Sequence, residues 1–78
     1  MYLEIISPGK KLFSGEVKSV KLPGADGSFG VLNRHAPIIS SLKKGQVKVV
    51  DASSQTHSFD INGGVAEVLN NKLIVLAE

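Results

Sequence analysis

Hydrophobic and polar residues alternate along short stretches of this chain. In residues 45–50, Val47 and Val49 fall on one face of an extended segment, while Gln46 and Lys48 fall on the other. A period of two is typical of a β-strand with one face buried and one face in water. We therefore predict a strand of a half-solvated antiparallel sheet here.

Residues 57–61 repeat the pattern, because His57, Phe59 and Ile61 share a face opposite Ser58 and Asp60. Turn signals separate such stretches about every 8–12 residues, a spacing typical of β-sandwiches and barrels. The turn signals lie at residues 7–9, 23–30, 43–45, 52–54, 62–64 and 70–71. No segment predicts a helix of about ten residues or more.

The apolar phase slips by one residue between residues 12 and 22. Phe13 and Val17 share one parity, whereas Val20 and Leu22 share the other. A one-residue slip turns every later side chain to the opposite face unless a β-bulge absorbs it. We therefore predict a bulge near Lys18, in a strand that bends and serves both sheets of a sandwich.

The last fifteen residues predict two strands, Gly64–Leu69 and Lys72–Ala77. Asn70 and Asn71 can occupy the positive-φ positions of a two-residue type I′ turn between them. The apolar residues also fit a helical stripe, but the β-branched residues favour strands. The run from Leu73 to Leu76 is apolar on both faces, which predicts a central strand or a strand covered by a partner.

Length and composition limit the possible functions. The 78 residues make one domain, 1–78, with a small core and little room for an enzyme cleft. The chain has no Cys and only two His, so it has no disulfide or thiolate zinc site, and we expect no metal or cofactor. Its longest apolar run is five residues, far too short to cross a membrane.

Charge does not favour nucleic-acid binding. Residues 1–48 hold eight Lys or Arg against three acids, and residues 49–78 hold one Lys against four acids. The basic residues are scattered and are not interleaved with the four aromatic residues, as they are in a stacking platform.

No catalytic constellation is evident. Gly24, Gly27 and Gly30 lack the following helix that a phosphate-binding loop needs, so we expect them to set tight turns. We expect His57 to be packed in the fold and His35 to lie in a loop, with no carboxylate or nucleophile at suggestive spacing from either. An alternative function is a lipoyl- or biotinyl-like carrier or binding module, with its modified lysine at Lys72 beside a hairpin tip.

Six short motifs, in register along essentially the whole chain, resemble the epsilon subunit of F-type ATP synthases. Each motif is weak alone, and their order and spacing carry the resemblance. They are Leu-Phe-Ser-Gly-Glu-Val at 12–17, the glycine loop at 24–31, His-Ala-Pro-Ile-Ile at 35–39, Leu-Lys-Lys-Gly at 42–45, Gly-Gly-Val-Ala-Glu-Val at 63–68 and Leu-Ile-Val-Leu-Ala at 73–77.

The resemblance implies an all-β fold, a flattened antiparallel β-sandwich of about ten short strands in two sheets. It implies a non-catalytic rotor subunit that joins the gamma subunit to the membrane c-ring and couples proton- or sodium-driven rotation to ATP synthesis. Such a subunit is peripheral, on the cytoplasmic face of the bacterial inner membrane. We expect the isolated chain to be a monomer. Because it stops at Glu78, we also expect no C-terminal helical hairpin and no inhibition by that arm.

The resemblance also assigns residues to two contacts. For the loop from 24 to 34, facing the c-ring, they are Asp26, Gly27, Ser28 and Arg34. For the gamma contact they are His35, Ala36, Pro37 and Ile38. The sequence departs from many relatives at Asn33 and Arg34, where Pro-Gly is common, and at Ser28, where an acidic residue often stands.

Overall fold

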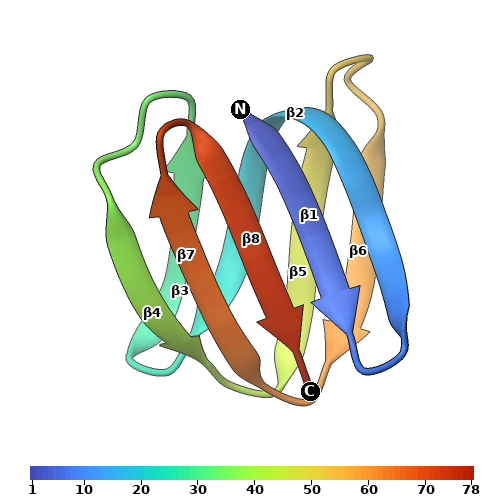
Figure 1. The fold of residues 1–78 in the computed structure, drawn as a ribbon, viewed down its shortest axis with the longest axis vertical. Coiled ribbons are helices and arrows are strands. Elements are labelled where there is room, and N and C mark those ends of the chain that lie inside the picture. The colour runs from blue at the N-terminus through green and yellow to red at the C-terminus, as the bar shows by residue number, and fades with distance from the viewer.

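The computed structural model describes all 78 residues and contains eight strands and no helix (Figure 1). It has no helix long and apolar enough to span a membrane. The strands are β1 (Tyr2–Ser7), β2 (Lys10–Gly24), β3 (Gly27–Leu32), β4 (Ile38–Leu42), β5 (Gly45–Asp51), β6 (Thr56–Ile61), β7 (Gly64–Leu69) and β8 (Lys72–Ala77).

The strands form two layers that share β2. The first sheet has the order β4-β7-β8-β1-β2, and the second has the order β3-β2-β5-β6. Figure 1 shows β4, β7, β8 and β1 in front of β3, β5 and β6. All pairs are antiparallel except β1 with β8, which is parallel. The sandwich is confirmed, with eight strands rather than about ten; the 15-residue β2 runs through both sheets, and counting it in each gives nine.

The predicted bulge is confirmed in β2. Val17 pairs with Asp51 and Ser19 with Val50, so Lys18 has no partner residue on β5. The part of β2 before the bulge pairs with β1, the part after it pairs with β3, and β5 pairs with β2 on both sides of the bulge. The extra residue bends the strand from one layer to the other, and it keeps Val17 and Val20 in the core.

Sixteen buried hydrophobic residues form one core between the layers, and no polar side chain is buried with them. Val47 and Val49 are buried while Gln46 and Lys48 are exposed, as the alternation predicts. Leu73 and Val75 of β8 are also fully buried. The hydrophobic effect of this single core is therefore what holds the two sheets face to face.

The short turns follow the sequence signals. Asn70 and Asn71 have φ angles of 52° and 60°, which confirms the left-handed turn between β7 and β8. Gly27 has a φ of 133°, and a Cβ on Gly24 would lie 2.5 Å from the carbonyl oxygen of Gly27. These two glycines therefore close the β2–β3 turn, as expected. Gly30 has no positive φ and no close neighbour at the Cβ position, so the turn does not explain why residue 30 is a glycine.

Candidate protein–protein interface

The outer face of the first sheet carries hydrophobic side chains with nothing over them. Ile39 is 74% exposed, Leu76 is 53% exposed and Leu69 is 50% exposed. Val65 is also among the five exposed large hydrophobic residues of the chain, and only Leu32 lies outside this sheet. A protein of this size rarely leaves hydrophobic residues gathered on one face unless that face binds something.

Strand pairing makes these side chains neighbours. Val65 of β7 pairs with Leu76 of β8, which pairs with Ile6 of β1. In the next row, Ile39 pairs with Glu67, which pairs with Ile74. We call this set the apolar face: Ile6, Ile39, Val65, Leu69, Ile74 and Leu76. The sequence indicated only its β8 part, since the run from residue 73 to 76 is apolar on both faces.

A charged cluster borders the apolar face. Glu4 carboxylate oxygens lie 3.1 Å from Lys72 Nζ and 3.2 Å from Lys11 Nζ. Hydrogen bonds first from Lys72 and then from Lys11 lower the pKa of Glu4 below its usual value of 4.5. Lys72 Nζ also lies 5.7 Å from the centre of the Tyr2 ring. The cluster gives the face a fixed polar rim, as protein interfaces commonly have.

The predicted gamma-contact residues lie beside the apolar face. Pro37, Ile38 and Ile39 line a groove of about 380 Å³ together with Glu67 and Leu69. The main chain turns into this segment at Arg34, which has a φ of 61°. The His35 amide donates to the Leu32 carbonyl, and its ring nitrogen Nδ1 lies 2.7 Å from the Ala36 carbonyl oxygen. These bonds fix the conformation of residues 32–36.

One residue of that set, Ile38, has an inward-facing side chain, and its contact with gamma stays a prediction. The side chain of Ile38 packs against the core, because it lies on the inward-facing parity of β4 with Leu42. Its neighbour Ile39 points outward instead and is the most exposed large hydrophobic residue of the chain. A partner on this surface would touch the Ile39 side chain far more than that of Ile38.

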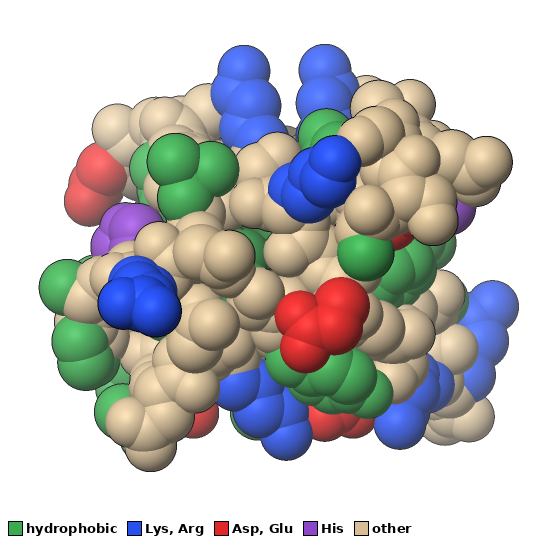
Figure 2. All heavy atoms as spheres, turned by 90° about the horizontal axis from the view of Figure 1, so that it is seen from above, with side chains coloured by type: hydrophobic (Ala, Val, Ile, Leu, Met, Phe, Trp, Pro, Cys, Tyr) green, Lys and Arg blue, Asp and Glu red, His purple; other side chains and the backbone are tan.

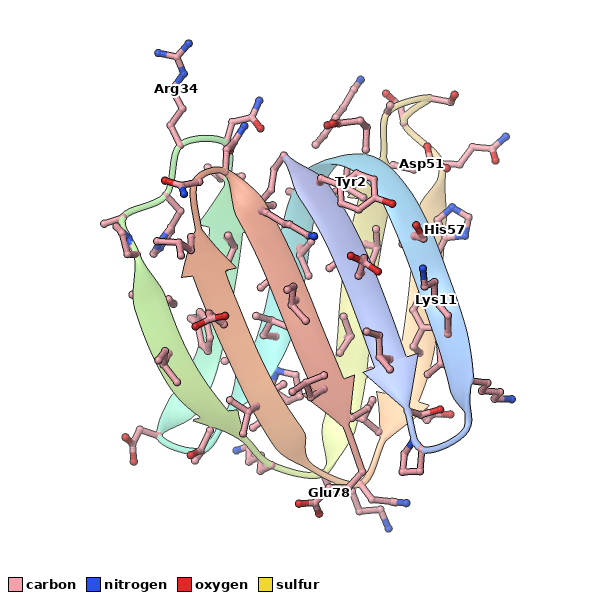
Figure 3. All side chains as sticks on the ribbon, in the orientation of Figure 1. Tyr2, Lys11, Arg34, Asp51, His57 and Glu78 are labelled. Carbon is pink, nitrogen blue, oxygen red and sulfur yellow. The ribbon has the colours of Figure 1, made fainter.

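The predicted c-ring loop is not one loop. Asp26 and Gly27 lie at the β2–β3 turn and Ser28 follows in β3, whereas Arg34 lies beyond the other end of that strand (Figure 3). Six residues of strand separate two ends by about 20 Å. Asp26 and Arg34 therefore lie at opposite ends of β3, which pairs with β2 along residues 27–32, and the c-ring contact of each stays a prediction. Arg34 belongs with the neighbouring His35.

The end that carries Arg34 has mixed chemistry. Figure 2, which looks onto that end, shows hydrophobic, basic and acidic side chains interspersed with polar atoms. The Arg34 amide donates to Asn71 Oδ1 at 2.8 Å, which ties residues 33–37 to the β7–β8 turn.

His57 has a carboxylate partner that spacing alone did not reveal. Its Nε2 lies 2.8 Å from Asp51 Oδ2, and its ring packs 5.5 Å from the Phe13 ring. Asp51 Oδ1 also accepts the amides of Ser53 and Gln55, both at 2.9 Å. The hydrogen bond from His57, followed by that from Gln55, lowers the pKa of Asp51 below its usual value of 3.8. These contacts fix the β5–β6 turn, and no nucleophile joins them.

Lys72 does not sit at a hairpin tip, which argues against a carrier domain. Asn70 and Asn71 form the tip, and Lys72 is the first residue of β8. Its ammonium group is paired with Glu4 and lies over Tyr2. No three His, Asp or Glu side chains lie close enough together to hold a metal ion.

Comparison with known families decides what this sandwich is. The sequence model described as the beta-sandwich domain of the ATP synthase delta/epsilon chain matches residues 1–78. The chain belongs to this family. Its match spans every motif from the Phe-Ser-Gly at 13–15 to the last strand.

Three relatives are each named ATP synthase epsilon chain. The protein of Caulobacter vibrioides is 46% identical over 78 residues, which are all of this chain and 90% of that protein. The protein of Chlorobium limicola is 46% identical over 76 residues, covering 97% of this chain and 86% of its own length. The protein of Hyphomonas neptunium is 42% identical over 78 residues, yet this chain spans only 58% of it.

Two solved structures share the fold. A chain in the mitochondrial ATP synthase of Euglena gracilis, in a structure titled OSCP/F1/c-ring, has a TM-score of 0.90 and 21% identity. This chain is covered to 96%, and the Euglena chain to 48%. A chain in the central stalk/c-ring structure of Tetrahymena thermophila has a TM-score of 0.80 and 18% identity, with coverages of 99% and 62%. At these identities the likeness shows the fold.

Proposed function

We propose that this chain is a non-catalytic rotor subunit of an ATP synthase. In this role it joins the gamma subunit to the c-ring and transmits rotation driven by protons or sodium ions to the catalytic sites. It would work as a peripheral part of the membrane-bound complex, on the cytoplasmic face of the bacterial membrane. The observation that carries the proposal is the apolar face, whose exposed hydrophobic residues suit it to bind a partner. The family of this chain consists of ATP synthase subunits.

A coupling element needs stiffness and two contact surfaces. Stiffness comes from β2, which is hydrogen-bonded into both sheets, and from the single core between the sheets. The apolar face with the adjacent residues 33–37 supplies one contact, which we assign to gamma. The β2–β3 turn at Asp26 and Gly27, with Ser28 beside it, supplies the other at the far end of the sandwich, which we assign to the c-ring.

The apolar face can be tested by binding to the gamma subunit of the same organism. Leu76→Glu places a charge in the middle of the row that Val65 and Ile6 complete. Hot-spot residues of interfaces contribute about 2 kcal/mol or more, so we expect at least a tenfold weaker affinity, measured by calorimetry or co-purification. Ser53→Glu, at an exposed position of the β5–β6 turn, is the matched control and should bind like the parent chain.

Two outcomes would overturn the assignment. The first is a parent chain that fails to bind gamma or a gamma–c-ring assembly. The second is a Leu76→Glu variant that stays folded by circular dichroism and binds as tightly as the Ser53→Glu control. Turnover of ATP by the isolated chain would contradict the non-catalytic role.

The turn at the far end needs a separate test. Asp26→Lys reverses one exposed charge at the proposed c-ring contact and leaves the apolar face untouched. We expect this variant to bind isolated gamma normally but to bind a gamma–c-ring assembly more weakly. Equal loss of affinity for both would place Asp26 at the gamma contact instead.

A further inference from the structure

The outer face of the second sheet has a different chemistry from the apolar face. Lys21 of β2 pairs directly with Lys48 of β5. Their outer neighbours in the row are Gly30 of β3 and Ser58 of β6, so the row holds two ammonium groups and no acid. Lys43, in the β4–β5 turn, adds a third positive charge near Lys21 and Lys48.

These lysines have no carboxylate partner within 4 Å, unlike Lys11 and Lys72 of the first sheet, which both pair with Glu4. The nearest acid along the face, Asp60, accepts a hydrogen bond from Gln46 at 3.1 Å. Like charges directly opposite each other on a sheet destabilise it. The isolated chain therefore carries a repulsion that an acidic ligand would relieve.

The same face is hollowed. A groove of about 590 Å³ runs over β3, β2, β5 and β6, and a smaller one of about 280 Å³ continues toward Lys43 and Lys44. Gly30 and Ser58 keep the floor low because their side chains are short. Leu32, which is 62% exposed, lines the larger groove together with Val50, and the two give one row of the groove apolar positions. We call this surface the lysine groove; its defining residues are Gly30, Leu32, Lys21, Lys48 and Ser58.

We propose that the lysine groove binds an extended acidic segment of a partner protein. Carboxylates of the segment would lie over Lys21 and Lys48, and one apolar side chain would cover Leu32. The groove lacks the features of a nucleic-acid site, because Phe29 packs against the core and no aromatic ring faces outward for bases to stack on. It also lacks the arginine fork or helix N-terminus that typically binds phosphate.

The lysine groove and the apolar face lie on opposite sides of the sandwich (Figure 1). An acidic segment could therefore bind while the apolar face is covered by another protein. The proposal does not depend on the rotor role, since it can be tested on the isolated chain. Loss of gamma binding in the Leu76→Glu variant and loss of acidic-peptide binding are thus separate results.

The direct test is fluorescence anisotropy with a labelled ten-residue peptide of alternating Glu and Leu. We expect saturable binding that weakens as salt rises, because screening reduces charge attraction. The double variant Lys21→Gln/Lys48→Gln should bind at least tenfold more weakly. The matched control Lys10→Gln/Lys18→Gln removes the same charge outside the groove and should change the affinity by less than about threefold.

Three results would overturn the proposal. One is equal loss of binding in the two double variants. Another is equal binding of a peptide with Gln in place of every Glu. The last is tighter binding, with the same dependence on Lys21 and Lys48, to phosphatidylglycerol vesicles or to a thymidine oligonucleotide, which would assign the groove to lipid or nucleic acid.

A second measurement guards against misfolding of the variants. Because Lys21 and Lys48 repel each other, Lys48→Gln should raise the Tm of the isolated chain by about 1–4 °C. Lys10→Gln should leave the Tm within about 1 °C of the parent. A lower Tm for Lys48→Gln would contradict the repulsion on which the proposal rests.

Discussion

Single residues show where the backbone allows no substitute. Gly64 has a φ of 146°, and a Cβ built on it would overlap the carbonyl oxygen of Leu76 on the neighbouring strand. The sequence predicted a turn near Asn62 and Gly63 but could not show this close approach, since it depends on the β7–β8 pairing. The contact between His57 and Asp51 was missed for a related reason: it joins residues across the β5–β6 turn rather than along one strand.

Gly64→Ala should lower the free energy of unfolding by about 4 kcal/mol or more, because backbone strain and a steric overlap add. Gly27→Ala is the matched control, since Gly27 has a φ of 133° but open space around its Cβ position. Gly27→Ala should lower the free energy of unfolding only by the backbone strain, about 1–3 kcal/mol. Urea denaturation measures both values, and equal losses would show that the overlap with β8 is relieved at no cost.

Stability should depend on pH through Asp51. Its pKa is lowered in the folded state, so its stabilising contribution is complete above the usual value of 3.8 and is lost as the pH falls through the folded-state value. Between about pH 5 and pH 2, the urea midpoint of Asp51→Asn should fall less steeply than that of the parent. His57→Gln should be intermediate, because the amides of Ser53 and Gln55 remain. If the urea midpoints of all three proteins fall equally with pH, Asp51 is not the source of the pH dependence.

At the scale of elements, sequence reasoning was most successful where periodicity and turn chemistry agreed. It placed Gly64–Leu69 and Lys72–Ala77 at their observed bounds and found the bulge at Lys18 from the slipped apolar phase. The same slip predicted a single strand that bends and serves both sheets, and β2 does so. Sequence reasoning could not show that β1 pairs with β8 in parallel, since neither strand's pattern encodes its neighbour's direction.

The β7–β8 turn depends on two residues in the left-handed conformation. Asn70 has a φ of 52° and an exposed side chain, so its main role is conformational. Asn70→Val should therefore destabilise the chain by about 1–2 kcal/mol, whereas Asn70→Gly should change stability by less than about 0.5 kcal/mol. Thermal or urea unfolding measures the difference. A Val variant as stable as the Gly variant would mean that the turn has changed type.

At the scale of the whole molecule, the sandwich presents three surfaces of distinct chemistry. The first sheet carries the apolar face, with Glu67 between Ile39 and Ile74, the second sheet is basic and hollow, and the β2–β3 turn is small and polar. The sequence pointed to a covered face only through the residues from 73 to 76. The remainder of the apolar face comes from β1, β4 and β7, whose side chains become neighbours only through the strand order.

The most direct test is a solvent-accessibility map of the methyl groups by NMR, with and without the gamma subunit bound. We predict that Ile39, Val65 and Leu76 lose access to a soluble paramagnetic probe when gamma binds. Leu32, on the second sheet, should remain as accessible as in the free chain. Protection of Leu32 with Ile39, Val65 and Leu76 still exposed would contradict the assignment of the apolar face to gamma.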